Sequence, residues 1–321
     1  MVRTATTSLE IVEPLPLVRT RGRWQTISRD LARNRHLYLM LLPVLLYYVV
    51  FHYLPMYGAV IAFQDFNPVK GVFGSRWVGL ENFRDFFSSV YFGRLIFNTV
   101  AISVLEIVFA FPAPIILALL INELRWNPFR RLVQTVTYLP HFISVVVVVG
   151  VMFDFLARDG LVNQLLASPS PTAFMQDPDW FRQLFVGSGI WQHVGWGSIV
   201  FLAAITAIDP QLYDAAKVDG ASRFRQIWHV TIPGILPTIV ILLVLRLGSV
   251  MTVGYEKIIL MYNPLTYETA DVISTYVYRR GILQADFGFS AAVGLFNSVI
   301  NFALLLIANR VSKRLTDASL W

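Results

Sequence analysis

The stretch "PQLYDAAKVDGASRFRQIWHVTIPGILP", residues 210–237, decides how the rest of the chain is interpreted. It is polar, charged and helical in pattern. It lies between two long apolar runs, "GSGIWQHVGWGSIVFLAAITAI" before it and "TIVILLVLRLGSVMTVGYEKIIL" after it. Runs of that length and composition are typical of membrane-spanning helices. The stretch is therefore expected to be a folded loop between two spans.

The local chemistry of this loop predicts two short helices joined at a sharp corner. Asp209 is suited to cap the first helix, and Ser222 is suited to cap the second. Gly220 supplies the left-handed residue that ends a helix. Ala215 and Ala216 keep one face of the first helix flat, which favours close docking in a groove of a soluble partner. An ordinary amphipathic connector remains the alternative.

The composition of the whole chain indicates a membrane protein. Of its 321 residues, 56% are hydrophobic and only 14% are charged, whereas a soluble domain has about a quarter charged residues. The net charge of +6 comes without a basic stripe of interleaved aromatics, so lipid is the expected partner and nucleic acid is not. The absence of cysteine excludes disulfides, thiol catalysis and cysteine-ligated metals.

The fold class expected is all-α, a polytopic membrane protein with six spans. A bilayer core of about 30 Å takes about 20 helical residues. Six apolar runs meet that length, near 37–62, 95–121, 133–156, 184–208, 237–260 and 288–309. Pro112, Pro114 and Pro140 fall inside the second and third runs, where kinks packed within the bundle are expected.

Orientation follows from the basic N-terminal arm, "RTRGRWQTISRDLARNRH", residues 19–36. Positive residues favour the cytoplasmic side. The expected organisation is a cytoplasmic tail (1–36), a six-span domain (37–310) with a cytoplasmic loop at 209–236, and a cytoplasmic C-terminal tail (311–321). The chain is then expected in the bacterial inner membrane, with both termini on the cytoplasmic side.

The loop also resembles a known motif. "DAAKVDGASRFRQIWHVTIPGILP" is similar to the EAA loop of permease subunits in ABC-type importers, with an aspartate where the family usually has glutamate. The stretches "GLENF" (79–83), "FNTV" (97–100) and "YLPHFIS" (138–144) resemble sugar-importer permeases, in particular the branch that handles alginate and other polymeric carbohydrates. The residues that match the loop motif are Asp214, Ala215, Ala216, Asp219, Gly220, Ala221, Phe224, Ile227 and Pro233.

This resemblance implies a type I ABC importer permease core of the MetI-like kind. The chain would be one half of a heterodimeric pore, joined by a second homologous permease, two ATP-binding subunits and an extracytoplasmic solute-binding protein. The helix from Asp214 to Gly220 would couple the pore to the ATPase. ATP and Mg would bind the partners, because this chain has no Gly-Lys pair and hence no P-loop.

No catalytic or metal motif is present, so an enzyme is not expected. There is no HExxH sequence. Five histidines are scattered singly, and each is expected to pack or to lie at an interface: His36, His52, His141, His193 and His229.

Polar residues inside spans are costly in lipid and commonly face a cavity. Arg246, Glu106, Asn297 and Asn301 are such residues, and they predict a carbohydrate path lined by amide and guanidinium donors. An internal Arg246–Glu106 pair or hydrogen bonds between helices is an equally weighted alternative. Lys257 is expected near the outer end of the fifth span, reaching the interface.

Two further readings stay open. Trp191 and Trp196 are suited to stack on sugar rings, although aromatics at span ends are commonly interfacial belt residues. The alternative function is an ion-driven secondary transporter, in which Glu106 beside Pro112 would be the intramembrane carboxylate.

Overall fold

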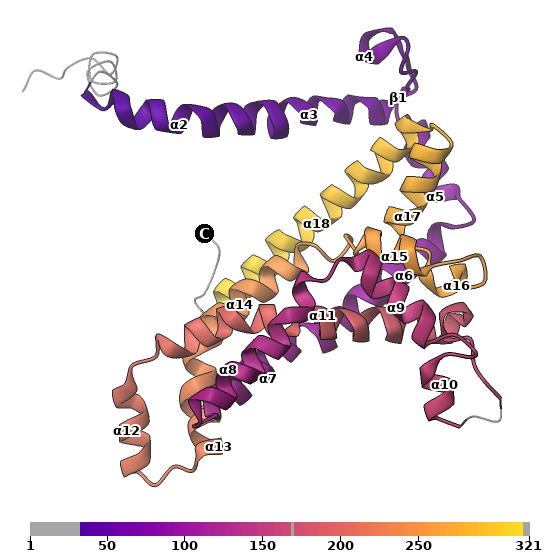
Figure 1. Cartoon of the computed structure of the whole chain (residues 1–321). Coiled ribbons are helices and arrows are strands. Elements are labelled where there is room, and N and C mark those ends of the chain that lie inside the picture. The colour runs from indigo at the N-terminus through magenta and orange to yellow at the C-terminus, as the bar shows by residue number, and fades with distance from the viewer. Residues whose placement is uncertain (1–32, 168–169, 317–321) are drawn as a thin grey trace, which may run out of the picture. The chain divides into compact units, whose positions relative to one another are not determined.

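The computed structural model describes residues 33–167 and 170–316, which divide into two compact units between Tyr57 and Gly58. The first unit is one helical rod (Figure 1). Its elements are α2 (Arg35–Tyr48), the π-helical turn η1 (Val49–Tyr53) and α3 (Leu54–Met56). Most of the basic N-terminal arm lies outside the described residues.

The second unit is predominantly helical, with one short antiparallel ladder in which Gln64 pairs with Trp77. Its elements are η2 (Tyr57–Phe63), which starts at the boundary, β1 (Gln64–Asp65), α4 (Gly71–Gly74), β2 (Arg76–Trp77), α5 (Glu81–Ser88), α6 (Phe92–Leu105), η3 (Glu106–Ala110), α7 (Pro112–Glu123), α8 (Asn127–Tyr138), η4 (Leu139–Phe142), α9 (Val145–Phe155), α10 (Leu161–Leu165), η5 (Phe174–Gln176), α11 (Pro178–Thr206), α12 (Pro210–Val218), α13 (Arg223–Gln226), η6 (Ile227–Thr231), α14 (Ile232–Leu247), α15 (Tyr255–Met261), α16 (Tyr267–Ala270), α17 (Ile273–Tyr278), η7 (Arg279–Leu283) and α18 (Phe287–Thr316).

The structure supports the all-α, multi-span prediction. Within residues 33–167 and 170–316, four helices are long and apolar enough to cross a membrane, or six if each of two bent pairs counts as one span. The four are Arg35–Phe63, Phe92–Glu123, Arg223–Leu247 and Phe287–Arg314.

The third span differs from its prediction. One span with a kink at Pro140 was expected near 133–156, but α8–η4 and α9 are separate helices bent by 97° at a short break. Pro140 lies in the 3-10 turn before the break, where its missing N–H and its ring prevent a regular α-helix. Ser144 then starts a new helix by accepting a hydrogen bond from Val146 N at 3.3 Å. The break is therefore set by a proline followed by a cap.

The fifth span differs more. It was predicted at 237–260, but the helix runs from Arg223 to Leu247 and the chain from 248 to 254 is not helical. Its start lies earlier because α13 continues through the π-helical turn η6 directly into α14. After the helix ends at Leu247, the non-helical chain is held against α18, where Asn301 accepts a hydrogen bond from Met251 N at 2.9 Å. One helix thus joins the loop motif to the membrane.

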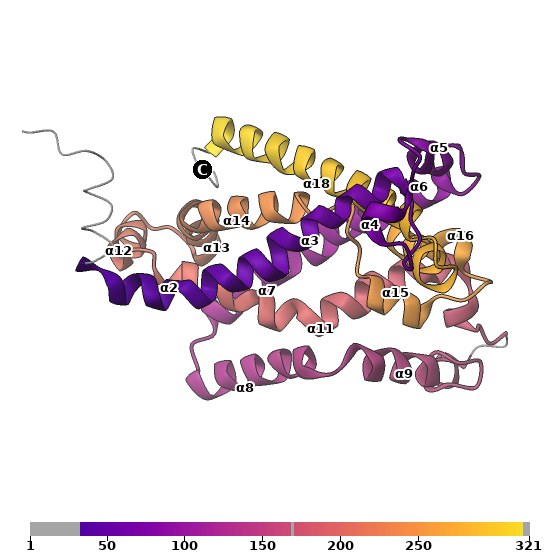
Figure 2. The ribbon, with the colours of Figure 1, turned by 90° about the horizontal axis from the view of Figure 1, so that it is seen from above.

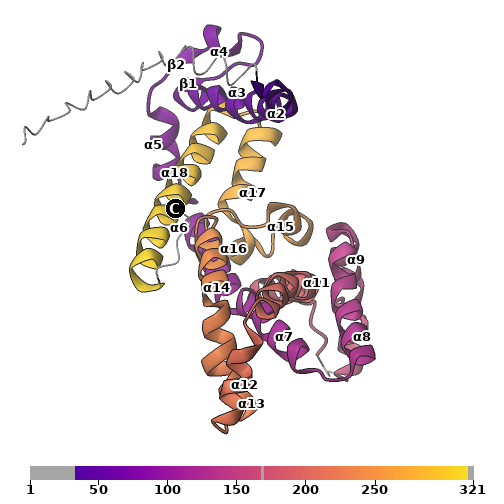
Figure 3. The same ribbon diagram turned by 90° about the vertical axis from the view of Figure 1, so that its left-hand side faces the viewer.

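Helix α11 is central to the second unit. Figure 2 shows α8, α11, α14 and α18 in that lateral order, and Figure 3 shows α8 and α9 along one side of α11. Gly195 lies where α11 meets α8, and any side chain there would collide with the backbone of Thr137. A buried cluster that includes Ala118, Phe201 and Ile235 holds α7, α11 and α14 together. These contacts place one face of α11 between α7 and α14.

Candidate functional site

The loop motif folds as predicted, as a capped hairpin. Asp209 accepts a hydrogen bond from Gln211 N at 2.9 Å and so caps α12. Gly220 has a φ of +72°. Its N–H donates to Lys217 O at 3.0 Å, and the next N–H, of Ala221, donates to Ala216 O at 2.9 Å. This pair of bonds is a Schellman motif, which ends a helix at a left-handed glycine.

The second cap and the outer face of the hairpin are also defined. Ser222 accepts a hydrogen bond from Arg225 N at 3.5 Å and so caps α13. Val218 is 89% exposed and Phe224 is 74% exposed. Asp214 and Lys217 form an exposed ion pair at 2.9 Å on the same helix. An exposed apolar tip with small residues beside it can dock into a groove of another protein.

The base of the hairpin is tied to two helices of the bundle. Arg223 forms an ion pair with Glu123 at the end of α7, at 3.4 Å. Tyr213 on α12 shares a hydrogen bond with the buried Thr231, at 3.0 Å. Gly234 packs so closely that an added Cβ would lie 2.6 Å from the side chain of Ile208. The hairpin is therefore in direct contact with α7 and with the segment that follows α11.

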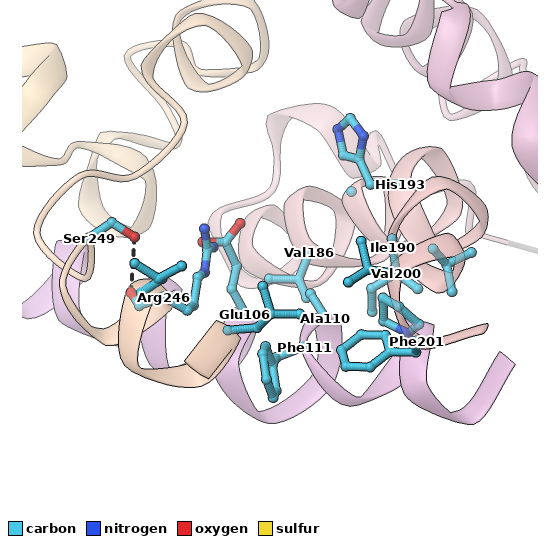
Figure 4. Close-up of a pocket in the computed structure, with 16 residues that line it drawn as sticks. Glu106, Ala110, Phe111, Val186, Ile190, His193, Val200, Phe201, Arg246 and Ser249 are labelled. Atoms are coloured by element: carbon cyan, nitrogen blue, oxygen red, sulfur yellow. Dashed lines mark hydrogen bonds and ion pairs between the residues drawn. The ribbon is translucent and has the colours of Figure 1, made fainter. Parts of the chain in front are cut away.

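The same helices line an open cavity of about 590 Å³. Its polar centre is an ion pair between Glu106 in η3 and Arg246 in α14, at 2.5 Å, with the side chains 20% and 39% exposed. Figure 4 shows these two side chains, from different helices, pointing toward one another. Ser249 donates to the backbone oxygen of Arg246 at 2.9 Å and ends the helix at this point. The Arg246–Glu106 alternative is confirmed as a contact.

A second cavity of about 530 Å³ shares Glu106, Gly189 and His193 with the first. Gly189, His193 and Gly197 follow at intervals of four along α11 and so occupy one helix face. Gly197 lets Pro114 of α7 pack closely against α11, because an added Cβ there would lie 3.0 Å from the proline ring, and His193 lines both cavities. The cavities are therefore neighbours along one face of α11.

His193 is a residue whose role sequence reasoning missed. Its Nδ1 lies 3.1 Å from Nδ1 of His141, which is 52 positions away in the chain. His141 is stacked on Trp196 with ring centroids 4.6 Å apart and planes within 3°. These histidines are scattered singly in the sequence, but the structure brings this pair together because "YLPHFIS", at the break between α8 and α9, lies against α11. The stack on Trp196 fits the packing role expected of His141. In the sequence, the interval of four between Gly189, His193 and Gly197 already indicated that these residues share one helix face.

Lys257 is also placed differently from its prediction. It was expected to reach the interface at the end of a long fifth span. Because that span ends at Leu247, Lys257 lies on α15 and turns inward to line the second cavity. Its Nζ donates to Phe185 O at 2.9 Å and lies 4.9 Å from the centroid of the Phe185 ring.

The two predicted asparagines lie apart from the ion pair. Asn301 on α18 accepts from Met251 N and donates to Thr252 Oγ1, both at 2.9 Å. Asn297 is on the same helix, and neither residue lines the two cavities that contain Glu106. The contacts of Asn301 match the alternative of hydrogen bonds between segments, whereas the path role of both residues stays a prediction.

The donor sets in the described residues do not suggest a metal centre. Within 33–167 and 170–316, no group of three or more His, Cys, Asp or Glu side chains is placed to hold a metal ion. The arrangement instead offers hydrogen-bond donors, a charge pair and stacked rings beside open volume. Such a set is suited to binding a polar molecule with apolar faces.

Most of the chain matches a known protein family. The family of binding-protein-dependent transport system inner membrane components matches residues 110–317, which include the hairpin and Arg246 and begin four residues after Glu106.

Solved structures and sequence relatives that are similar to this chain are also transporter proteins. Two crystal structures each give a TM-score of 0.85. One is a bacterial ABC transporter involved in the import of the acidic polysaccharide alginate, at 45% identity over 91% of this chain and 99% of that one. The other is a bacterial alginate ABC transporter in complex with an alginate pentasaccharide-bound periplasmic protein, at 44% identity over 93% and 99%. The polygalacturonan/rhamnogalacturonan transport system permease protein YteP of Bacillus subtilis is 44% identical over 294 residues, 91% of this chain and 92% of that protein.

Proposed function

This chain belongs to the family of binding-protein-dependent transport system inner membrane components, and we propose that it carries acidic oligosaccharides or polysaccharides. It is a membrane-spanning permease subunit of an ATP-driven importer. The observation that carries the proposal is the charged cavity beside α11, whose walls are the helices to which the hairpin is tied. Transport and coupling thus share α7, α11 and α14.

The substrate class rests on relatives and on the lining of the cavities. One solved relative imports alginate and one curated relative is named for polygalacturonan and rhamnogalacturonan. Uronic acid polymers present one carboxylate per acidic residue together with many hydroxyls. In this chain, Arg246 and Lys257 supply cationic donors, Gln192 and His193 supply hydrogen-bonding groups, and His193 contacts the Trp196–His141 stack. Alginate is the named candidate within this class.

The Glu106–Arg246 pair gives the cavity a way to bind an acidic chain without trapping it. With no substrate, Glu106 neutralises Arg246, so no unpaired charge is buried. A uronate that enters competes with Glu106 for the guanidinium. Binding of the uronate leaves Glu106 without its partner, and this cost lowers the net affinity, which suits a site that must release what it binds.

Coupling is proposed to run through the hairpin. In this scheme the hairpin lies on the cytoplasmic side, and the exposed tip at Val218 and Phe224 docks on an ATP-binding subunit. A switch of the pore from mostly one state to mostly the other needs about 5.5 kcal/mol of differential binding. The contacts of Arg223 and Gly234 carry displacement of the tip into α7 and α11.

The assembly follows from the same scheme. A second homologous permease completes the pore, two partner subunits bind ATP and Mg, and an extracytoplasmic solute-binding protein delivers the substrate. The chain itself is not proposed to catalyse a reaction. The ion-driven alternative would need neither the hairpin nor these partners.

The test is uptake by the assembled transporter in proteoliposomes, with binding protein and with ATP enclosed. Length-matched oligouronates and neutral oligosaccharides are offered in parallel. We expect ATP-dependent uptake of the oligouronates and little uptake of the neutral chains. Preference for neutral chains would overturn the substrate class, and uptake driven by an imposed proton or sodium gradient without ATP would overturn the function.

A further inference from the structure

A polar recess lies at the end of the second unit that is opposite to the hairpin. Figure 1 shows β1, α5 and the start of α18 at one end, and α12 and α13 at the other. The recess has a volume of about 400 Å³ and is formed by the β1–β2 ladder, α5 and the turn before α18. Its acidic lining residues are Asp65, Glu81, Asp85 and Asp286.

The stretch "GLENF" builds one wall of this recess. Gly79 has a φ of +64°, which turns the chain from β2 into α5. Asn82 then donates hydrogen bonds to Ala62 O at 2.9 Å and to Gln64 O at 3.1 Å. Its neighbour Glu81 also lines the recess. The motif therefore has a structural consequence that the transport cavity does not use.

Acceptors outnumber donors in the recess. Asp286 pairs with Arg280, and Asp65 pairs with Arg76 at 3.8 Å. Glu81 and Asp85 lie one helical turn apart on α5, are exposed, and form no ion pair with any residue in the described part of the chain. Two carboxylates on one helix face repel one another unless a cation lies between them.

Gln64 adds an independent sign of a missing donor. This lining residue is only 6% exposed. Its Nε2 donates to Val72 O at 2.8 Å, so its Oε1 is directed to the other side of the amide. That oxygen is buried and has no hydrogen-bond partner among the residues that the structure describes. A buried acceptor without a donor costs about 1–3 kcal/mol, so a group that donates to it is favoured.

We propose that this recess receives a lysine or arginine side chain of the extracytoplasmic solute-binding protein. The inference rests on the proposed function, because it takes that protein as the partner. An ammonium or guanidinium group matches two free carboxylates and an unpartnered amide oxygen. An acidic sugar is disfavoured by repulsion. A metal ion is disfavoured because no group of three ligating side chains of the described residues is placed to hold one.

The first experiment measures the dissociation constant between the binding protein and the assembled transporter in nanodiscs. The double variant Glu81→Lys/Asp85→Lys is expected to weaken binding about tenfold or more, and Glu81→Gln/Asp85→Asn by less. The weakening is expected to shrink at high salt. ATP hydrolysis without binding protein is expected to be unchanged. An unchanged dissociation constant in the charge-reversed variant would overturn the proposal.

The matched control is Asp159→Lys, which reverses an exposed acidic residue that does not line the recess. It is expected to leave the dissociation constant unchanged. Weakening as large as that of the recess variant would indicate general surface repulsion and would overturn the specific assignment.

The second experiment exploits the absence of cysteine from this chain. Asp85→Cys provides a single thiol, which a short maleimide–succinimide reagent can link to a nearby lysine. We expect a cross-link to the binding protein from Asp85→Cys and none from Asp159→Cys. If chelation by EDTA abolishes binding to the wild type and not to Glu81→Gln/Asp85→Asn, a metal ion is the occupant and the proposal is overturned.

These outcomes separate the recess from the proposed function. If the binding protein stimulates the ATPase and the recess variants have no effect, the proposed function is retained and the recess proposal is overturned. A transporter that neither binds the protein nor hydrolyses ATP loses the function itself.

Discussion

The hairpin and the charged cavity are built in opposite ways. The hairpin takes its shape from bonds between neighbours in the chain, such as Gly220 N to Lys217 O. The cavity takes its centre from Glu106 and Arg246, which are 140 positions apart. The hairpin is a local structure that follows from the capping and turn preferences of neighbouring residues. The cavity exists only when α7, α11 and α14 are packed together. The proposed function needs both, because we propose that the hairpin contacts the ATP-binding partner and that the cavity contacts the substrate.

The largest expected effect is at Gly220, the corner of the locally determined hairpin. Gly220→Asp places a side chain at a φ of +72°, at a cost of about 1–2 kcal/mol. No atom lies within 4 Å of the added Cβ, so the protein is expected to fold and insert. The added charge and bulk at the corner are expected to reduce ATP-driven uptake about tenfold or more. Uptake and ATP hydrolysis are measured together.

The matched control is Gly220→Asn, because asparagine tolerates the left-handed region better than other residues. It is expected to retain most uptake. Normal uptake by Gly220→Asp would show that the corner has no coupling role.

The second effect is expected at the ion pair. Arg246→Ala leaves Glu106 without its partner. This change is expected to lower the free energy of unfolding by up to about 3 kcal/mol, and the melting temperature with it. The loss stays below that of a fully buried pair, because the Arg246 side chain is 39% exposed. Thermal unfolding in detergent and uptake of charged and neutral oligosaccharides are compared.

Glu106→Gln/Arg246→Gln separates stability from recognition. The double variant removes both charges, so it is expected to regain much of the stability that Arg246→Ala loses, while uptake of oligouronates remains reduced. Equal loss of neutral and acidic substrates would mean that the pair serves the fold and not carboxylate binding.

A smaller effect is expected at Asn301. Like the ion pair, its hydrogen bonds join segments that are distant in the chain. Asn301→Ala removes the acceptor for Met251 N and the donor to Thr252. The loss of these bonds is expected to cost about 1–3 kcal/mol. Faster amide exchange in residues 248–254 is the direct measurement. Asn301→Asp, which keeps the acceptor for the backbone N–H, is expected to retain part of the protection.

The smallest effect on stability is expected at Arg223, on the hairpin side. Its pair with Glu123 is exposed and 3.4 Å long, so Arg223→Ala is expected to cost about 0.2–1 kcal/mol. Uptake is expected to fall by more than this value suggests, because the contact links the hairpin to α7. A loss of uptake that Glu123→Ala does not reproduce would argue against the link.

Two predicted helices show where periodicity stops being informative. The third apolar run was predicted as one span, and Pro140 marked only a kink, whereas the structure breaks the helix by 97°. The fifth run was predicted to reach residue 260, whereas it ends at Leu247. Apolar residues in 248–260 belong to a turn and to α15, and hydropathy does not distinguish a buried turn from a span.

The membrane class, the approximate spans and the hairpin with its caps could be predicted from the sequence alone, because these follow from composition and from contacts within a few residues. The resemblance to importer permeases also indicated the family to which the chain belongs. Only the tertiary structure decided that His141 meets His193, that Lys257 turns inward, and that Arg246 finds Glu106. The physical reason is that a buried polar group requires a partner, and which partner is near depends on how distant helices pack.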